Sequence, residues 1–137
     1  MFFQVATILR NLSFGEENQA VLATNPTFLR FLLLCLHSRW DSLKQLGLDA
    51  LGNIAPELQL ERLSSDALLQ LILTAVTQRL FGQDRAGIIA SLEVLNKLGQ
   101  REDNEEAIQR ALDGKVMQLL AVIMCLKACK VFLSVYL

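Results

Sequence analysis

Apolar residues recur at helical spacing along most of the chain. The first such stretch spans residues 2–12, where Val5, Ile8 and Leu12 fall three or four positions apart and so share one helix face. Residues 26–36 are apolar nearly all round, which is typical of a helix inside a stack. No stretch shows the sustained alternation of apolar and polar residues that marks a strand. The pattern therefore predicts an all-α protein.

Turn and capping residues divide this pattern into separate helices. Pro56 ends or kinks one helix, and Gly99 is the predicted C-cap of another. Asp41, one of residues 64–66, and Asp103 or Asn104 are the predicted N-caps of later helices. The expected helices are residues 2–12, 16–23, 26–36, a helix after Asp41, residues 67–81, 85–98 and 105–112, and a last one after Asp113-Gly114.

Three similar segments stand at the ends of helices: Leu9-Arg10-Asn11-Leu12, Leu51-Gly52-Asn53-Ile54 and Leu95-Asn96-Lys97-Leu98. Leu12 and Ile54 are 42 residues apart, and Ile54 and Leu98 are 44 apart. A period of about 40–47 residues with two or three helices per unit is typical of armadillo and HEAT repeats. We therefore predict an armadillo/HEAT-like α-solenoid with about three repeats of 42–44 residues.

The whole chain, residues 1–137, is expected to form one helical repeat domain. Each repeat has helices that are apolar on more than one face, so it must stack on its neighbours. Neither end shows an obvious polar capping face. We therefore expect a fragment of a longer solenoid, with residues 121–137 as a divergent tail.

Composition and charge narrow the classes of function. The chain is 53% hydrophobic, with 13 basic against 14 acidic residues and a net charge of −1. A module that grips nucleic acid by its phosphates usually has a basic surplus, so we expect no direct nucleic acid contact. The apolar run from Val116 to Leu137 is interrupted by Gln118, Lys127 and Lys130, so no membrane span is expected.

Residues that could carry chemistry are few. The three cysteines, Cys35, Cys125 and Cys129, form no disulfide framework, and no histidine or cysteine cluster accompanies them to hold a metal. His37 is the single histidine and has no nucleophile arrangement around it. No Gly-rich phosphate loop is present. The sequence predicts a non-enzyme without metal, cofactor or small-molecule ligand.

The asparagines of the repeated segments are the first candidates for protein interaction. In armadillo arrays, asparagine at this place lines the concave groove and can bond the backbone of an extended peptide. Asn11 and Asn53 match, whereas the third segment has Lys97 there and Asn96 one place earlier. The alternative is that these side chains cap helix ends or bond a neighbouring turn.

Trp40 and Arg39 are the other candidates for protein interaction. Tryptophan and arginine are common energetic anchors of interfaces. The alternative is that Trp40, the only tryptophan, packs across a joint between repeats.

Several stretches resemble a known family. Residues Gln4–Phe14, Leu29–Leu34 and Gln45–Ala55 are similar to the armadillo region of the AT-rich interactive domain-containing subunits of polybromo-type SWI/SNF chromatin remodellers, as are Asp84-Arg85 and Glu93–Asn104 more loosely. The resemblance implies a nuclear, non-catalytic scaffold for transcription regulation whose partners are other subunits of the remodelling complex. DNA contact in that family comes mainly from modules absent here. A generic armadillo receptor for extended peptides and a membrane-anchored helical protein are the alternatives.

Overall fold

The computed structural model describes residues 1–61, 66–122 and 125, and every regular element within these residues is helical. The prediction of an all-α protein is confirmed. Residues 114–122 are also helical. The other elements in chain order are α1 (Phe2–Leu12), α2 (Glu16–Thr24), α3 (Pro26–Leu36), α4 (Asp41–Ile54), the 3-10 turn η1 (Ala55–Glu57), α5 (Ala67–Arg79), α6 (Arg85–Gly99) and α7 (Glu102–Ala111).

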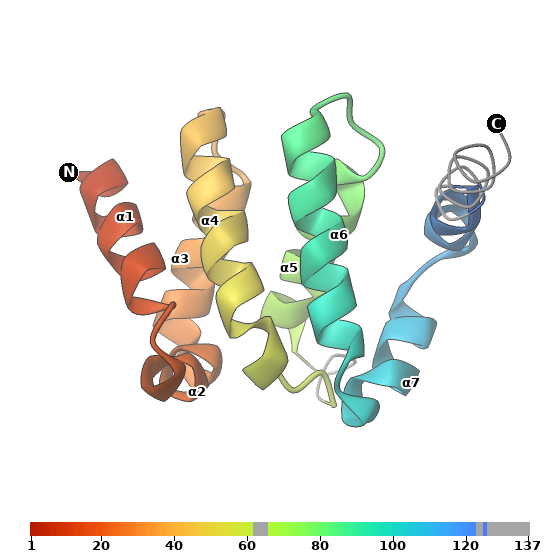
Figure 1. Ribbon diagram of the computed structural model, residues 1–137, viewed down its shortest axis with the longest axis horizontal. Helices are drawn as coiled ribbons and strands as arrows, with labels where there is room; N and C mark the ends of the chain where they lie inside the picture. Colours follow the sequence, from red (N-terminus) through yellow and green to blue (C-terminus); the bar gives the residue numbers. More distant parts are fainter. Residues whose placement is uncertain (62–65, 123–124, 126–137) are drawn as a thin grey trace, which may run out of the picture.

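Three long helices form a row along the molecule. Helices α1, α4 and α6 stand side by side, with α3 and α5 behind them and the short α2 and α7 near the lower ends (Figure 1). Helix α4 packs against α1 on one side and α6 on the other, and α3 contacts both α4 and α5. The row places the ends of α1, α4 and α6, where the three similar segments lie, next to one another.

One apolar cluster runs between the row and the helices behind it. Its least exposed members come from different helices and include Leu32, Leu51, Ile54, Val76 and Val94, each 1% exposed or less. Leu51 and Ile54 belong to the second repeated segment. The helical spacing of apolar residues is therefore explained by burial in this cluster.

Helices α3 and α4 approach each other closely at Gly47. A β-carbon placed on Gly47 would lie 2.9 Å from Cβ of Cys35, a separation that real side chains do not reach. Because Gly47 has no side chain, the two helices can meet here. Cys35, at this contact, is 1% exposed.

Burial also sets the acidity of Cys35. Desolvation raises the pKa of its thiol from 9.0 to about 11. Because the native state keeps this proton to higher pH than the unfolded state, the free energy of unfolding is expected to fall as pH rises from 9 to 11. In a Cys125→Ser/Cys129→Ser variant, iodoacetamide at pH 8 should alkylate the native protein far more slowly than the urea-unfolded protein. Equal rates would contradict this burial.

The corner between α6 and α7 is held by a buried asparagine. Asn104 is 0% exposed. Its Oδ1 accepts from the Leu60 backbone N–H at 2.8 Å, and its Nδ2 donates to the carbonyls of Leu58 at 2.8 Å and Leu98 at 3.1 Å. Arg101 adds a bond from Nη1 to the Pro56 carbonyl at 3.2 Å. The segment after α4 is thus fastened to the corner of the following unit.

Two of the predicted caps are wrong at this corner, whereas one predicted cap and one predicted helix end are confirmed elsewhere. Helix α7 begins at Glu102, with Arg101 as N-cap, so neither Asp103 nor Asn104 caps it. Gly99 is the last residue of α6, whose C-cap is Gln100. In contrast, Asp66 caps α5 by accepting from two backbone N–H groups, and Pro56 ends α4 as part of η1.

Asp41 is also not a cap, because it is the first residue of α4 and Trp40 holds the N-cap position without a side-chain bond.

The predicted divergent tail, residues 121–137, lies almost wholly outside the described residues, as does Cys129. Within the described residues, no single helix is long and apolar enough to cross a membrane; by length and composition alone, α2 and α3 together pass as a pair bent by 88°.

Candidate protein-interaction groove

The row of α1, α4 and α6 aligns equivalent residues from successive repeats. Asn11, Asn53 and Lys97 occupy the same position in the three similar segments. Asp49 lies one helical turn before Asn53 in α4, and Glu93 lies one turn before Lys97 in α6. Polar and charged groups therefore recur along one face of the row.

A pocket of about 220 Å³ opens on this face between α4 and α6. Its lining combines apolar residues with two carboxylates, an ammonium and an amide. The lining residues are Phe14, Leu48, Asp49, Gly52, Asn53, Ala90, Glu93 and Lys97. The structure thus brings together two of the residues predicted for protein interaction, Asn53 and Lys97.

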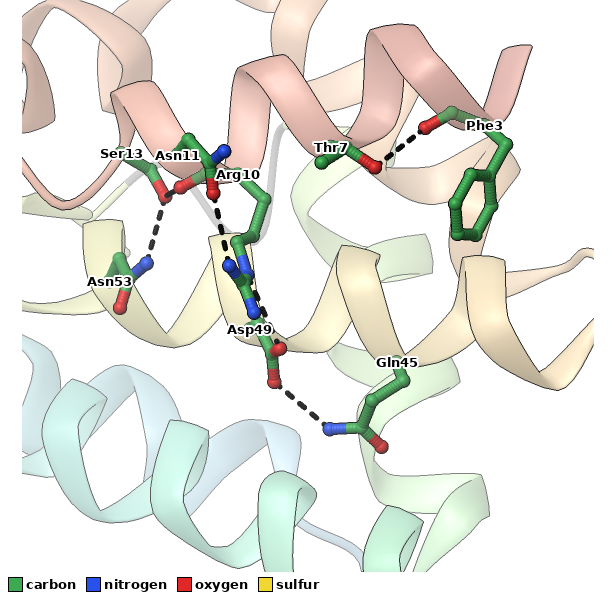
Figure 2. Close-up of polar contacts among 8 residues, drawn as sticks. All are labelled: Phe3, Thr7, Arg10, Asn11, Ser13, Gln45, Asp49 and Asn53. Carbon is green, nitrogen blue, oxygen red and sulfur yellow. Dashed lines mark hydrogen bonds and ion pairs between the residues drawn. The ribbon is translucent and has the colours of Figure 1, made fainter.

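A polar network fixes the side of the pocket nearest α1. Figure 2 shows Arg10 of α1 reaching Asp49 of α4, with Nε 3.5 Å from Oδ2. Gln45 donates to the other Asp49 oxygen at 2.9 Å, and Arg10 donates to Asn11 Oδ1 at 3.0 Å. The Arg10 guanidinium also lies 5.2 Å from the centre of the Phe14 ring. The shared contacts hold these side chains in place before any partner binds.

Asn53 joins α4 to the end of α1. Its Nδ2 donates to Ser13 Oγ at 2.9 Å, and Ser13, which is 0% exposed, donates in turn to the Arg10 carbonyl at 2.6 Å. Asn53 thus bonds the turn that follows α1. Its carbonyl oxygen has no hydrogen-bond partner in the part of the chain that the structure describes, so it remains able to accept a bond at the pocket rim.

The other predicted residues lie elsewhere. Asn11 is exposed and joins the network through Arg10, but it does not line the pocket. Asn96 is exposed and does not line the pocket either. Arg39 and Trp40 stand at the start of α4, far along the helix from Asn53. Trp40 is 62% exposed, so the alternative that it packs across a joint between repeats is wrong.

Sequence reasoning missed Arg10, Ser13, Asp49 and Glu93. A clue was present, because Asp49 and Glu93 each precede the groove positions Asn53 and Lys97 by four residues, one turn of helix. Their pairing across helices was not visible, since Arg10 and Asp49 meet only after α1 and α4 pack.

Among residues 1–61, 66–122 and 125, no three His, Cys, Asp or Glu side chains gather closely enough to hold an ion. His37 is exposed, with Nδ1 3.0 Å from the Leu33 carbonyl oxygen.

Comparison with known proteins finds two relatives that match most of this chain. No family model matches it. It is 47% identical over 110 residues, 80% of the chain and 6% of the relative, to AT-rich interactive domain-containing protein 2 of Mus musculus. It is 35% identical over 106 residues, 77% of the chain and 8% of the relative, to SWI/SNF chromatin remodeling complex subunit swsn-7 of Caenorhabditis elegans. The chain thus spans less than a tenth of either relative's length. Over most of its length it is related to AT-rich interactive domain-containing protein 2 and to this SWI/SNF subunit, as the sequence predicted.

Proposed function

We propose that this chain is part of an armadillo-like solenoid that acts as a non-catalytic protein-interaction scaffold in a SWI/SNF chromatin-remodelling complex. It would work in the nucleus, in transcription regulation, with other subunits of the complex as partners. The observation that carries the proposal is the 47% identity to AT-rich interactive domain-containing protein 2 across 80% of the chain. No nucleic acid, membrane or small-molecule contact is part of it.

The solenoid layout is supported by positions that recur in successive units. Leu12, Ile54 and Leu98 end the three similar segments, and α1, α4 and α6 stand in one row. Asn18 in α2, the helix after α1, donates from Nδ2 to the Leu12 carbonyl at 3.0 Å. Asn104 in α7, the helix after α6, donates from Nδ2 to the equivalent Leu98 carbonyl at 3.1 Å. Such translation of one contact pattern from unit to unit is what stacked repeats produce.

The groove is the face that we propose for partner contact. Its lining includes the charged side chains of Asp49, Glu93 and Lys97, and Asn53 offers a side-chain carbonyl there. A fixed groove with both charge signs suits an extended protein segment, because little ordering of the receptor opposes binding. The same feature favours the second candidate, a receptor for extended peptides, which differs in its partners rather than in its site.

An Asn53→Ala/Lys97→Glu variant should lose partner capture. The exchange removes a rim amide and reverses a rim charge, which together are expected to weaken binding about tenfold, or about 1.4 kcal/mol. The measurement is mass spectrometry of proteins retained from nuclear extract by the tagged chain. SWI/SNF subunits should be recovered with the native sequence and depleted with the variant.

The matched control is Asn96→Ala/Lys115→Glu, which makes the same two chemical changes at exposed positions outside the pocket. It should capture like the native chain. If the native chain retains chaperones but no remodeller subunit, the scaffold role is rejected. If unrelated peptides bind the groove while no remodeller subunit does, the second candidate is favoured.

A further inference from the structure

We propose that the groove between α4 and α6 takes an arginine side chain from the segment that it binds, with Glu93 as the ion-pair partner of the guanidinium. This inference rests on the groove of the proposed function and names the chemistry that a partner must present there. It follows from a contact that the chain already makes within itself, one unit earlier along the row.

The first joint of the row, between α1 and α4, is bridged by an arginine. Arg10 of α1 extends across the joint to Asp49 of α4, with Nε 3.5 Å from Oδ2 (Figure 2). Its Nη1 donates to Asn11 Oδ1 at 3.0 Å. The guanidinium is thus held by a carboxylate on the next helix of the row and by an amide oxygen on its own helix.

The second joint, between α4 and α6, repeats the carboxylate but not the arginine. The position of Arg10 in the repeated segment is taken by Gly52 in α4, and that of Asp49 by Glu93 in α6. Because Gly52 has no side chain, nothing from α4 crosses this joint at the equivalent place. A β-carbon on Gly52 would meet Cγ2 of Val94 at 3.7 Å, an ordinary contact distance, so this position is not crowded.

The carboxylate of the second joint is unused. Glu93 is exposed and forms no ion pair or hydrogen bond within residues 1–61, 66–122 and 125. Asp49 accepts a second bond from Gln45, four residues before it. The residue four before Glu93 is Ile89, whose side chain cannot donate. Glu93 therefore lacks both of the donors that its equivalent has.

The pocket of about 220 Å³ lies at this place, since Gly52, Asn53 and Glu93 all line it. Asn53 follows Gly52 as Asn11 follows Arg10, and its Oδ1 has no hydrogen-bond partner in the described part of the chain. An arginine entering from a partner is thus offered a carboxylate and an amide oxygen, the two kinds of acceptor that Arg10 uses. The planar fork of a guanidinium suits such a pair of acceptors better than the ammonium of lysine does.

Lys97 restricts what lies beside the incoming arginine. It lines the same pocket one helical turn after Glu93 and forms no ion pair among the described residues. A second basic residue of the partner next to the arginine would face this ammonium and be repelled. The bound segment therefore presents an isolated arginine with neutral or acidic neighbours.

The test is an NMR titration of the isotope-labelled 137-residue chain with the acetylated and amidated peptide Ala-Ser-Arg-Ser-Ala. A second peptide carries citrulline, which has nearly the shape of arginine but no charge. The arginine peptide should shift the amide signals of Gly52, Asn53 and Glu93. The citrulline peptide should bind about tenfold more weakly, because hydrogen bonds to a charged group are the stronger ones.

Two variants alter the two halves of the contact. Glu93→Gln should weaken binding of the arginine peptide about fivefold, because the charge of the carboxylate is lost. Gly52→Arg should abolish the shifts, because its own guanidinium then takes the place that Arg10 has in the first joint. The matched controls are Glu57→Gln, at an exposed residue that does not line the pocket, and Gly52→Ala, which adds only the uncrowded β-carbon. Both controls should bind like the native chain, and circular dichroism confirms that each variant is folded.

Equal binding of the two peptides overturns the proposal, as does a native chain that shifts with neither peptide or a Glu93→Gln variant that binds as tightly as the native chain. The titration contains no other protein, so its failure leaves the scaffold role standing. Arginine-dependent binding together with no remodeller subunit retained from nuclear extract would reject the proposed complex and keep the arginine site.

Discussion

Replacing Asn104 by alanine is expected to lower the free energy of unfolding by about 3 kcal/mol, because two or more buried backbone groups lose their partner. The side chain makes three hydrogen bonds, to Leu58, Leu60 and Leu98, and no water can reach it at 0% exposure. Urea unfolding followed by circular dichroism measures the change. The midpoint of thermal unfolding should fall by about 10 °C.

Asn18→Ala is the matched control for this change. Asn18 makes one hydrogen bond, to the Leu12 carbonyl, at a partly exposed site, so its loss should cost less than about 1 kcal/mol. An Asn104→Ala variant as stable as Asn18→Ala would show that the corner after α6 is not fastened as the structure has it.

Replacing Gly47 by leucine is the second change with a large expected effect, a loss of about 3 kcal/mol from overpacking. The first added carbon alone would stand 2.9 Å from Cβ of Cys35 and 3.6 Å from the Leu36 backbone nitrogen. Neither neighbour can rotate away, so α3 and α4 must separate. The measurement is again urea unfolding.

Gly99→Leu makes the same exchange in α6, where a β-carbon would have no heavy atom within 4 Å. There the higher helix propensity of leucine should leave stability unchanged or raise it by up to about 1 kcal/mol. Equal losses at both glycines would contradict the close approach of α3 and α4.

The bounds of the helices were largely predictable because local rules decide them. Helices α1 and α3 have the predicted limits, and Asp66 and Pro56 act as their residue types suggest. Apolar spacing and capping chemistry depend on neighbours in sequence, so one chain suffices to apply them.

The features of the fold that the sequence did not predict depend mainly on contacts between residues far apart along the chain. Asn104 looked like a cap, but the carbonyls of Leu58 and Leu98 and the N–H of Leu60 take up its amide. Gly99 looked like a C-cap, yet it is the last residue of α6 and Gln100 is the C-cap.

The candidate site was predicted only in part for the same reason. Asn53 and Lys97 do line the pocket, as their repeated position suggested. The repeat could not show that Arg10 pairs with Asp49, because these residues occupy different positions of their units. Which side chains form the groove is set by how neighbouring repeats meet.

The most direct measurement of the central proposal is site-specific photo-crosslinking in nuclear extract. A benzoylphenylalanine replaces Glu93 at the pocket rim in one variant and Leu71, a 51% exposed residue of α5 behind the row, in another. We expect SWI/SNF subunits to be crosslinked from position 93 and not from position 71. Crosslinks to those subunits from position 71 alone, or to none from either position, would contradict the groove as the scaffold's contact face.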